Sequence, residues 1–216
     1  MAGVMHTPAG RAGRLWLQRR LATARRAADL LDHKLRVLRA ERQRLSLQEE
    51  RTAATWQAAH READTWVVRG VLLGGQRAIR LTADRADAHV EIAWEQSMGL
   101  TYPAGATVTG PASAPGAPPA GNAALVEARE RCRLALDAAV QHAVVEAAAR
   151  LVEAQERATR RRLRAVEHRW IPRLEESLAR LLFKLEEDEH ADGVRLRWAA
   201  SLGADEEAEG PGGGRS

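Results

Sequence analysis

Apolar side chains recur at alternating steps of four and three residues between positions 17 and 45. Eight of the nine positions on this repeat are apolar, and Arg42 is the exception. A repeat that averages 3.5 residues places these side chains along one stripe of a helix, as in a coiled-coil seam. The predicted seam consists of Leu17, Leu21, Ala24, Ala28, Leu31, Leu35, Leu38 and Leu45. A helix with such a stripe needs a partner helix to cover it.

Start and stop signals bound this first helix. Thr7 suits a helix N-cap and Pro8 the first helical position, whereas Gly74 and Gly75 supply a stop. The sequence therefore predicts an N-terminal extension over residues 1–7 and a coiled-coil helix over residues 8–75.

The segment 76–121 has a different character and is predicted to be an insert. Val90, Ile92 and Trp94 alternate with polar or small residues, which indicates a short β-hairpin over about residues 89–102. Residues 103–121 hold five of the eight prolines, with many Gly and Ala residues. Because this composition cannot bury enough surface to fold, we expect a flexible loop there.

A second long helix is predicted over residues 122–199, with Asn122 as its N-cap, and a disordered acidic, glycine-rich tail over residues 200–216. Two long helices of similar length, joined by an insert, should fold back on each other, since neither can cover its own stripe. Each helix is too long for a compact domain of this size. The predicted fold is therefore all-α, an elongated antiparallel two-helix coiled coil with a small β-hairpin and a flexible loop inserted between the helices.

The apolar spacing of the second helix slips around Pro172. Three successive steps of four residues interrupt the heptad pattern there, which is a stutter that locally unwinds a supercoil. A proline inside a helix also removes a backbone hydrogen bond and usually bends the helix. The predicted seam of this segment consists of Leu163, Val166, Trp170, Leu174, Leu178, Leu181 and Leu185.

Composition narrows the function classes. The single cysteine, Cys132, excludes an intramolecular disulfide and multi-cysteine metal sites, which favours a reducing, cytoplasmic compartment. The sequence has no apolar run long enough to span a membrane and no hydrophobic core of a secretory signal, so we expect any membrane association to be peripheral.

Arginines concentrate between residues 160 and 173 of the second helix. Arg160, Arg161 and Arg164 should project away from the apolar stripe, and Glu167 is placed to pair with Arg164 or Arg160. Three interpretations remain open from the residues alone: a solvated helix face, a nucleic-acid surface, and a binding surface for an acidic protein partner. The acidic residues that follow directly, from Glu175 onward, weigh against nucleic acid.

Two stretches of sequence resemble the D subunits of the V-type and archaeal-type rotary ATPases. They are "KLRVLRAER" at residues 34–42 and "TRRRLRAVEHRWIPRLEESLARLLFKLEEDE" from Thr159. The resemblance covers roughly residues 8–73 and 122–199, and a short hairpin in the middle belongs to the family too.

The resemblance implies a noncatalytic rotor shaft in the central stalk of a proton-translocating ATPase or ATP synthase. Its partners would be the catalytic and noncatalytic subunits of the nucleotide-binding hexamer, the small F subunit of the stalk, and a funnel-shaped subunit on the membrane ring. The complex would hold the chain at the cytoplasmic face of the cell membrane, with no nucleic acid bound. The residues that match the family motif and could face the hexamer are Arg160, Arg161, Arg162, Arg164, Glu167, Ile171, Pro172, Arg173 and Glu175.

No catalytic, cofactor-binding or metal-binding residues are predicted. A phosphate-binding loop of the G-x-x-x-x-G-K-[ST] type is absent from the sequence, so nucleotide chemistry would belong to other subunits. The alternative to the rotor shaft is a coiled-coil adaptor or nucleic-acid-binding protein unrelated to a motor. Binding to DNA or RNA that falls steeply with salt would favour that alternative.

Overall fold

The computed structural model describes residue 8 and residues 10–82, 87–110 and 121–208. The chain divides into two compact units, and α1 (Gly10–Thr82) contributes to both. We call Asp32–Arg160 the central unit, and Met1–Leu31 with Arg161–Ser216 the terminal unit. The predicted extension over residues 1–7 and parts of the predicted loop and tail, 111–120 and 209–216, lie outside the described residues.

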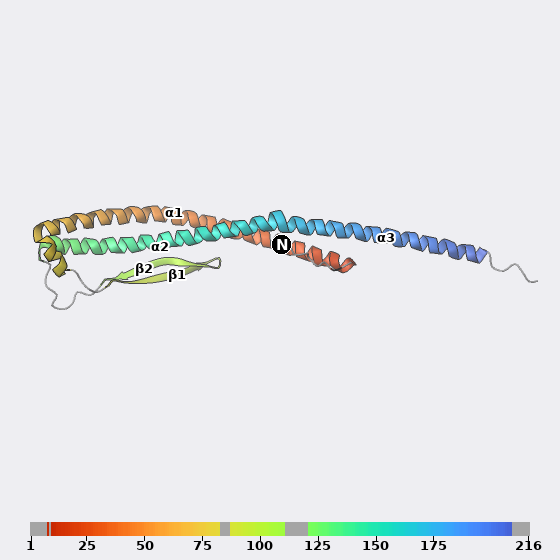
Figure 1. The fold of residues 1–216 in the computed structure, drawn as a ribbon, viewed down its shortest axis with the longest axis horizontal. Helices are drawn as coiled ribbons and strands as arrows, with labels where there is room; N and C mark the ends of the chain where they lie inside the picture. Colours follow the sequence, from red (N-terminus) through yellow and green to blue (C-terminus); the bar gives the residue numbers. More distant parts are fainter. Residues whose placement is uncertain (1–7, 9, 83–86, 111–120, 209–216) are drawn as a thin grey trace, which may run out of the picture. The chain divides into compact units, whose positions relative to one another are not determined.

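In the central unit, α1 packs antiparallel against α2 (Ala123–Ala165), and Figure 1 shows the two helices side by side. The antiparallel direction follows from side-chain contacts, because residue numbers rise along one helix as they fall along the other. Arg42 pairs with Glu156, whereas Glu62, further along α1, pairs with Arg131. The predicted antiparallel two-helix fold is confirmed in this unit.

The seam of the central unit is apolar over most of its length. Leu38, Leu45, Val145, Ala148 and Val152 form one buried cluster. Further along α2, Ala135 is buried, whereas its neighbour Leu134 is exposed.

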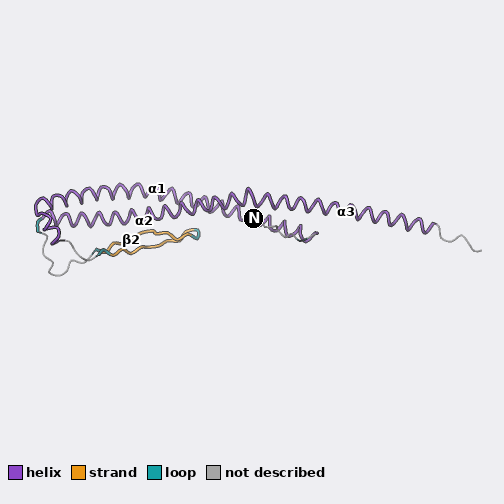
Figure 2. The backbone as a smooth tube through the Cα atoms, viewed as in Figure 1, coloured by secondary structure: helices purple, strands orange, loops and turns teal. Residues whose placement is uncertain are grey.

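A two-stranded antiparallel hairpin lies along the helices of the central unit, as Figure 2 shows. Its strands are β1 (His89–Ser97) and β2 (Leu100–Thr109), joined by a turn in which Met98 and Gly99 have positive φ. The predicted hairpin is confirmed, but the loop predicted from residue 103 is wrong for residues 103–109, which belong to β2. Proline is tolerated in this strand because a β-bulge lies beside it: Ala93 pairs with Gly105 and Trp94 with Pro103, which leaves one extra residue in β2.

α1 is broken, rather than ended, at the predicted glycine stop. Gly75 has φ 67° and ψ 172°, a conformation that L side chains rarely adopt, and helical structure resumes up to Thr82. α2 begins directly after its predicted cap, since Oδ1 of Asn122 accepts a hydrogen bond of 2.9 Å from the backbone N–H of Leu125.

In the terminal unit, the first part of α1 packs antiparallel against α3 (Ile171–Ala208). Arg11 contacts Glu189 and Arg25 contacts Glu175, so the residue numbers again run in opposite directions. The tail predicted to be disordered from residue 200 is helical up to Ala208. Residues 200–208 consist mainly of Ala, Glu and Asp with one Leu, and the high helix propensity of Ala, Glu and Leu lets the helix continue despite Gly203.

Candidate functional site

The seam of the terminal unit surrounds two leucines that are almost fully buried. Leu17 is 0% exposed and Leu174 is 1% exposed, and Leu21 completes the buried cluster. The predicted seam residues that pack around it in part are Ala24, Leu178 and Leu181, together with Trp16 and Ile171. Of the other predicted positions, Ala28, Leu35, Leu38, Leu45 and Leu163 are buried, whereas Leu31, Val166 and Leu185 are half-buried.

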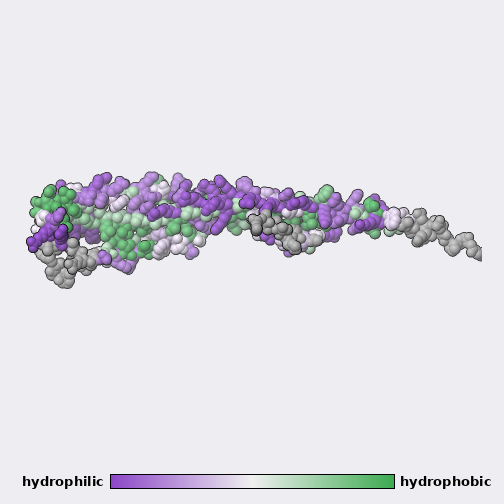
Figure 3. Space-filling view, in the orientation of Figure 1, coloured by the Kyte–Doolittle hydropathy of each residue, from purple (hydrophilic) through white to green (hydrophobic). Residues whose placement is uncertain are grey.

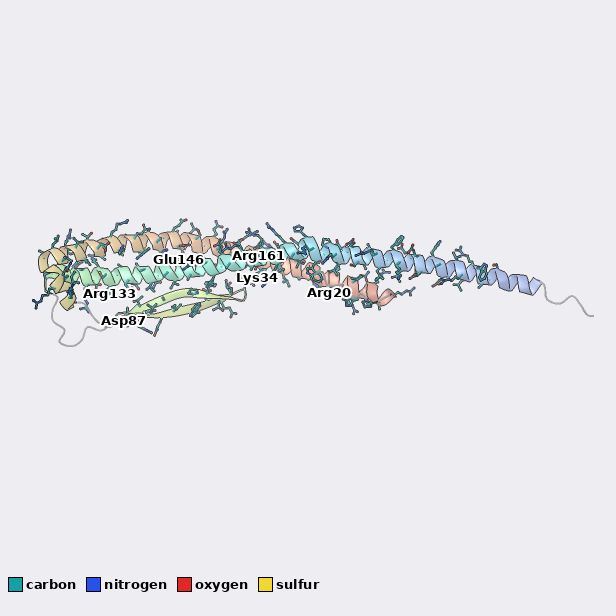
Figure 4. All side chains as sticks on the ribbon, viewed as in Figure 1. Arg20, Lys34, Asp87, Arg133, Glu146 and Arg161 are labelled. Carbon is teal, nitrogen blue, oxygen red and sulfur yellow. The ribbon has the colours of Figure 1, made fainter. Side chains whose placement is uncertain are left out.

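Trp170 is the predicted seam residue that the structure places elsewhere. Its side chain is 44% exposed, and the guanidinium of Arg20 lies 5.6 Å from its ring centre. The same guanidinium lies 5.0 Å from the ring of Trp16, and Figure 4 labels Arg20 on α1. Arg20 therefore makes cation–π contacts from α1 to the helical turn that holds Trp170.

That turn is a π-helical segment, η1 (Val166–Trp170), between α2 and α3. The backbone N–H of Ile171 donates to the carbonyl of Val166, five residues earlier, and the residue after Ile171 is Pro172, which has no N–H to donate. A π turn inserts one residue into a helix and rotates everything after it. The slip in apolar spacing that the sequence shows around Pro172 thus coincides with a local change of helix type.

The arginine segment is divided between paired and unpaired side chains. Arg160 pairs with Glu156, one turn earlier. The predicted pairing of Glu167 with Arg164 or Arg160 is wrong, since Glu167 forms no ion pair with either arginine in the described part of the chain. Within the described part of the chain, Arg161, Arg162 and Arg164 are exposed and form no ion pair. Because no acidic side chain among the described residues pairs with these three guanidiniums, they can bind acidic groups of a partner protein.

The remaining family-motif residues lie on the other side of the π turn. Arg173 is exposed and forms no ion pair among the described residues, whereas Glu175 pairs with Arg25 at 2.7 Å. Both partners of that pair are about half exposed, with 60% for Arg25 and 47% for Glu175. Exposed pairs of this kind contribute at most about 1 kcal/mol, so the pair adds little to stability.

A charged layer in the central unit was not anticipated from the sequence. Glu156 is 2% exposed and lies at a seam position one turn after Val152. Its carboxylate contacts Nε of Arg42 at 3.0 Å, Nε of Arg39 at 3.6 Å, and Arg160 on its own helix. The signal in the sequence is Arg42, the one charged residue among the nine positions of the first seam, which favours an opposite charge at the facing position of the partner helix.

The hairpin is fixed to the two helices by polar contacts at both of its ends. Nζ of Lys34 donates to the carbonyl of Met98 at 2.7 Å, and Figure 4 labels Lys34 close to the turn of the hairpin. Near the other end, Nε2 of Gln141 donates to the carbonyl of Ala106 at 2.7 Å. Between them, Tyr102 is 3% exposed and belongs to the buried cluster of the helical seam. The hairpin therefore forms part of the core of this unit.

Large apolar side chains are exposed in both units. In the central unit, Val68, Leu72 and Leu73 are 56%, 80% and 72% exposed near the break in α1, where Figure 3 shows a hydrophobic region. In the terminal unit, Val194, Leu196 and Trp198 of α3 are exposed beyond Glu189, which is level with Arg11 near the start of α1. Large apolar side chains that stay exposed and lie close together are typical of protein interfaces.

Within the described residues, no cluster of three or more His, Cys, Asp or Glu side chains is suited to hold a metal ion. No helix in the same part of the chain is sufficiently long and apolar to span a bilayer. A family model for the D subunit of ATP synthase matches residues 15–201, which include both long helical segments and the hairpin. A search of curated proteins found no match.

Proposed function

Because the chain belongs to the family of ATP synthase D subunits, we propose that it is the noncatalytic rotor shaft in the central stalk of a V/A-type proton-translocating ATPase or ATP synthase. The shaft transmits torque between the membrane ring and the catalytic hexamer, so that proton flow is coupled to ATP synthesis or hydrolysis. The observation that carries the proposal is the family match, which spans both helical segments and the insert between them.

The mechanical properties of a paired helix support this function. In each unit two antiparallel helices bury a common apolar seam, so bending or twisting one helix must also deform the other. A single exposed helix has no such support. The packing of the hairpin into the central seam adds a third element at that point.

The unpaired arginines support binding to the hexamer. Arg161, Arg162, Arg164 and Arg173 carry guanidiniums that can pair with acidic groups on successive subunits. A moving contact is better served by exposed, exchangeable ion pairs than by a dry apolar interface, because each pair costs little to break.

The exposed apolar side chains of each unit suit interfaces with other subunits. We propose that the end of α3 with Val194, Leu196 and Trp198 enters the cavity of the hexamer. We propose that the end with Val68, Leu72 and Leu73 is held by the funnel-shaped subunit on the membrane ring. The small F subunit of the stalk would also bind this chain, and the chain would meet the membrane only through the complex, at its cytoplasmic face.

Co-expression with the catalytic and noncatalytic subunits of a V/A-type hexamer and the small stalk subunit tests the proposal. We expect one copy of this chain per hexamer by size-exclusion chromatography and mass determination, and loss of that copy when residues 159–198 are deleted. If the chain separates cleanly from an assembled hexamer, the rotor function is wrong. Salt-titrated binding to DNA and RNA would then test the adaptor alternative.

A charge-reversal pair makes the test specific to the arginine segment. Arg161→Glu with Arg162→Glu should weaken retention on the hexamer. Arg51→Glu with Arg61→Glu is the matched control, because both of these arginines are exposed on α1 and form no ion pair within the described residues. Equal retention of the two variants would remove the arginine segment from the hexamer interface.

A further inference from the structure

Glu156 is a buried carboxylate in a mostly apolar helical seam. Among the described residues, Glu156 and Thr159 are the two buried polar or charged side chains, and Glu156 alone carries a charge. Its neighbours along the seam, Val152 and Leu163, are buried and apolar. A carboxylate in this position is costly unless other groups compensate its charge.

The compensation comes from both helices. Arg42 and Arg39 reach Glu156 from α1 at 3.0 and 3.6 Å, and Arg160 reaches it from one turn further along α2. The side chains of these three arginines are about half exposed, whereas the carboxylate is covered. Replacing a buried ion pair by apolar residues of similar volume often costs no stability. Removing one member of the pair strongly destabilises a protein when the other charge is left buried and unpaired.

The sequence on either side of Arg42 shows what a shifted pairing would cost. If α2 moved by one heptad along α1, Glu156 would face either Leu35 or Glu49 in place of Arg42. Likewise, Asp32 or Ser46 would replace Arg39. Either shift replaces both of these arginines and brings an acid of α1 near the buried carboxylate. The apolar seam itself resists such a shift weakly, because heptad-shifted leucines still pack together.

We propose that Glu156 determines the axial register of α2 against α1, because it pairs with two arginines of α1 that lie opposite it only in the observed alignment. This role does not depend on assembly into a complex. Its value for torque transmission, which does rest on the proposed function, is that two helices that cannot slide keep the length of the shaft constant under load.

The register can be measured in the full-length chain with two spin labels. Cys132 on α2 is exposed and is the single cysteine, and Ser46→Cys on α1 adds an exposed second site. Arg131 pairs with Glu62, so Cys132 lies about 16 residues, or roughly 24 Å, along α1 from residue 46. A shift of one heptad would change the separation along the axis by about 10 Å, which pulsed electron paramagnetic resonance resolves.

We expect one narrow distance distribution for the doubly labelled chain. Adding Glu156→Leu should keep helicity and the thermal midpoint but produce a second population displaced by about 10 Å. His142→Leu is the matched control, because it removes a different polar contact between the helices, the 3.1 Å bond of His142 to Thr52, and should leave one population.

A single unchanged population in Glu156→Leu would overturn the proposal. If that variant loses its helical structure, Glu156→Gln decides instead. The amide has the same shape and no charge, and a single population in folded Glu156→Gln would equally overturn the proposal. Because every readout comes from the isolated chain, failure here leaves the hexamer test unaffected.

Discussion

The hydroxyl of Tyr102, on strand β2, donates a hydrogen bond of 3.2 Å to Oε1 of Glu41 on α1. Arg44 binds the same carboxylate through two nitrogens, with contacts of 2.6 and 3.0 Å to its two oxygens. The hydrogen bond from Arg44 holds the pKa of Glu41 below its usual range. Burial raises the pKa of Tyr102, and the negative charge of Glu41 adds to this rise.

Titration of Tyr102 therefore reports whether the hairpin is docked. It is the single tyrosine of the chain, so the absorbance of its phenolate can be followed without interference from other tyrosines. In the folded chain we expect its midpoint above the ordinary value of about 10. A midpoint at or below about 10 in the folded chain would show that the ring is not held in the seam beside Glu41.

The raised pKa of Tyr102 also makes the free energy of unfolding depend on pH in the alkaline range. The folded-state pKa of Tyr102 is raised, so the folded chain binds its proton more tightly than the unfolded chain does. The resulting stabilisation is fully present below the pKa that Tyr102 has in the unfolded chain. It is lost as the pH rises through the pKa that Tyr102 has in the folded chain. Tyr102→Phe is the control, since the difference in unfolding free energy between the two chains should shrink only in this alkaline range.

Gly70→Ala should destabilise the central unit although alanine favours helix. A Cβ at Gly70 would lie 2.5 Å from Cδ2 of Leu125, which is 6% exposed and has little room to move. Overpacking a core costs about 1–3 kcal/mol, which exceeds the propensity gain of about 1 kcal/mol. Gly193→Ala is the matched control, because nothing lies within 4 Å of a Cβ there, and it should stabilise α3.

Thermal unfolding followed by circular dichroism measures both glycine variants. We expect the midpoint to fall for Gly70→Ala and to rise for Gly193→Ala. Adding Leu125→Val to Gly70→Ala should recover part of the loss, because it shortens the side chain nearest the new methyl group. A rise for Gly70→Ala of the same size as for Gly193→Ala would mean that α1 and α2 are further apart than the structure has them.

The helices and the hairpin could be predicted from the sequence because their signals are local. Heptad spacing placed Leu17, Leu35 and Leu38 in the seam, and the alternation of Val90, Ile92 and Trp94 indicated a strand. Yet those three strand residues are exposed, and the hairpin buries Tyr102 instead. Alternation shows which side chains share a face, but the contacts with the helices decide which face is covered.

The parts that could not be predicted depend on residues far apart in the sequence. Pairing with β1 keeps residues 103–109 extended despite their composition, and a bulge accommodates Pro103. Glu156 breaks the apolar pattern of its own helix, and only the opposite position of Arg42 explains it. A charged residue within the seam of one helix is therefore explained by the residue that faces it on the other helix.

Replacing Pro172 should change the stability of the chain and its proposed function in opposite directions. In Pro172→Ala the new N–H can compete for a carbonyl of the preceding turn, and a proline inside a helix costs up to about 3 kcal/mol. We expect a higher thermal midpoint for the isolated chain. A change of η1 from π-helix to α-helix would alter the orientation of α3 relative to the turn before it.

In an assembled complex that pumps protons, the proposed rotor function predicts that Pro172→Ala impairs pumping. Pro172→Ala should pump fewer protons per ATP hydrolysed, since the contacts of α3 depend on the local geometry that η1 provides. Glu176→Ala is the matched control, because it alters an exposed position one turn later without changing the backbone. Equal pumping by both variants, with the higher midpoint of Pro172→Ala retained, would show that the π turn serves the folding of the chain and not the coupling.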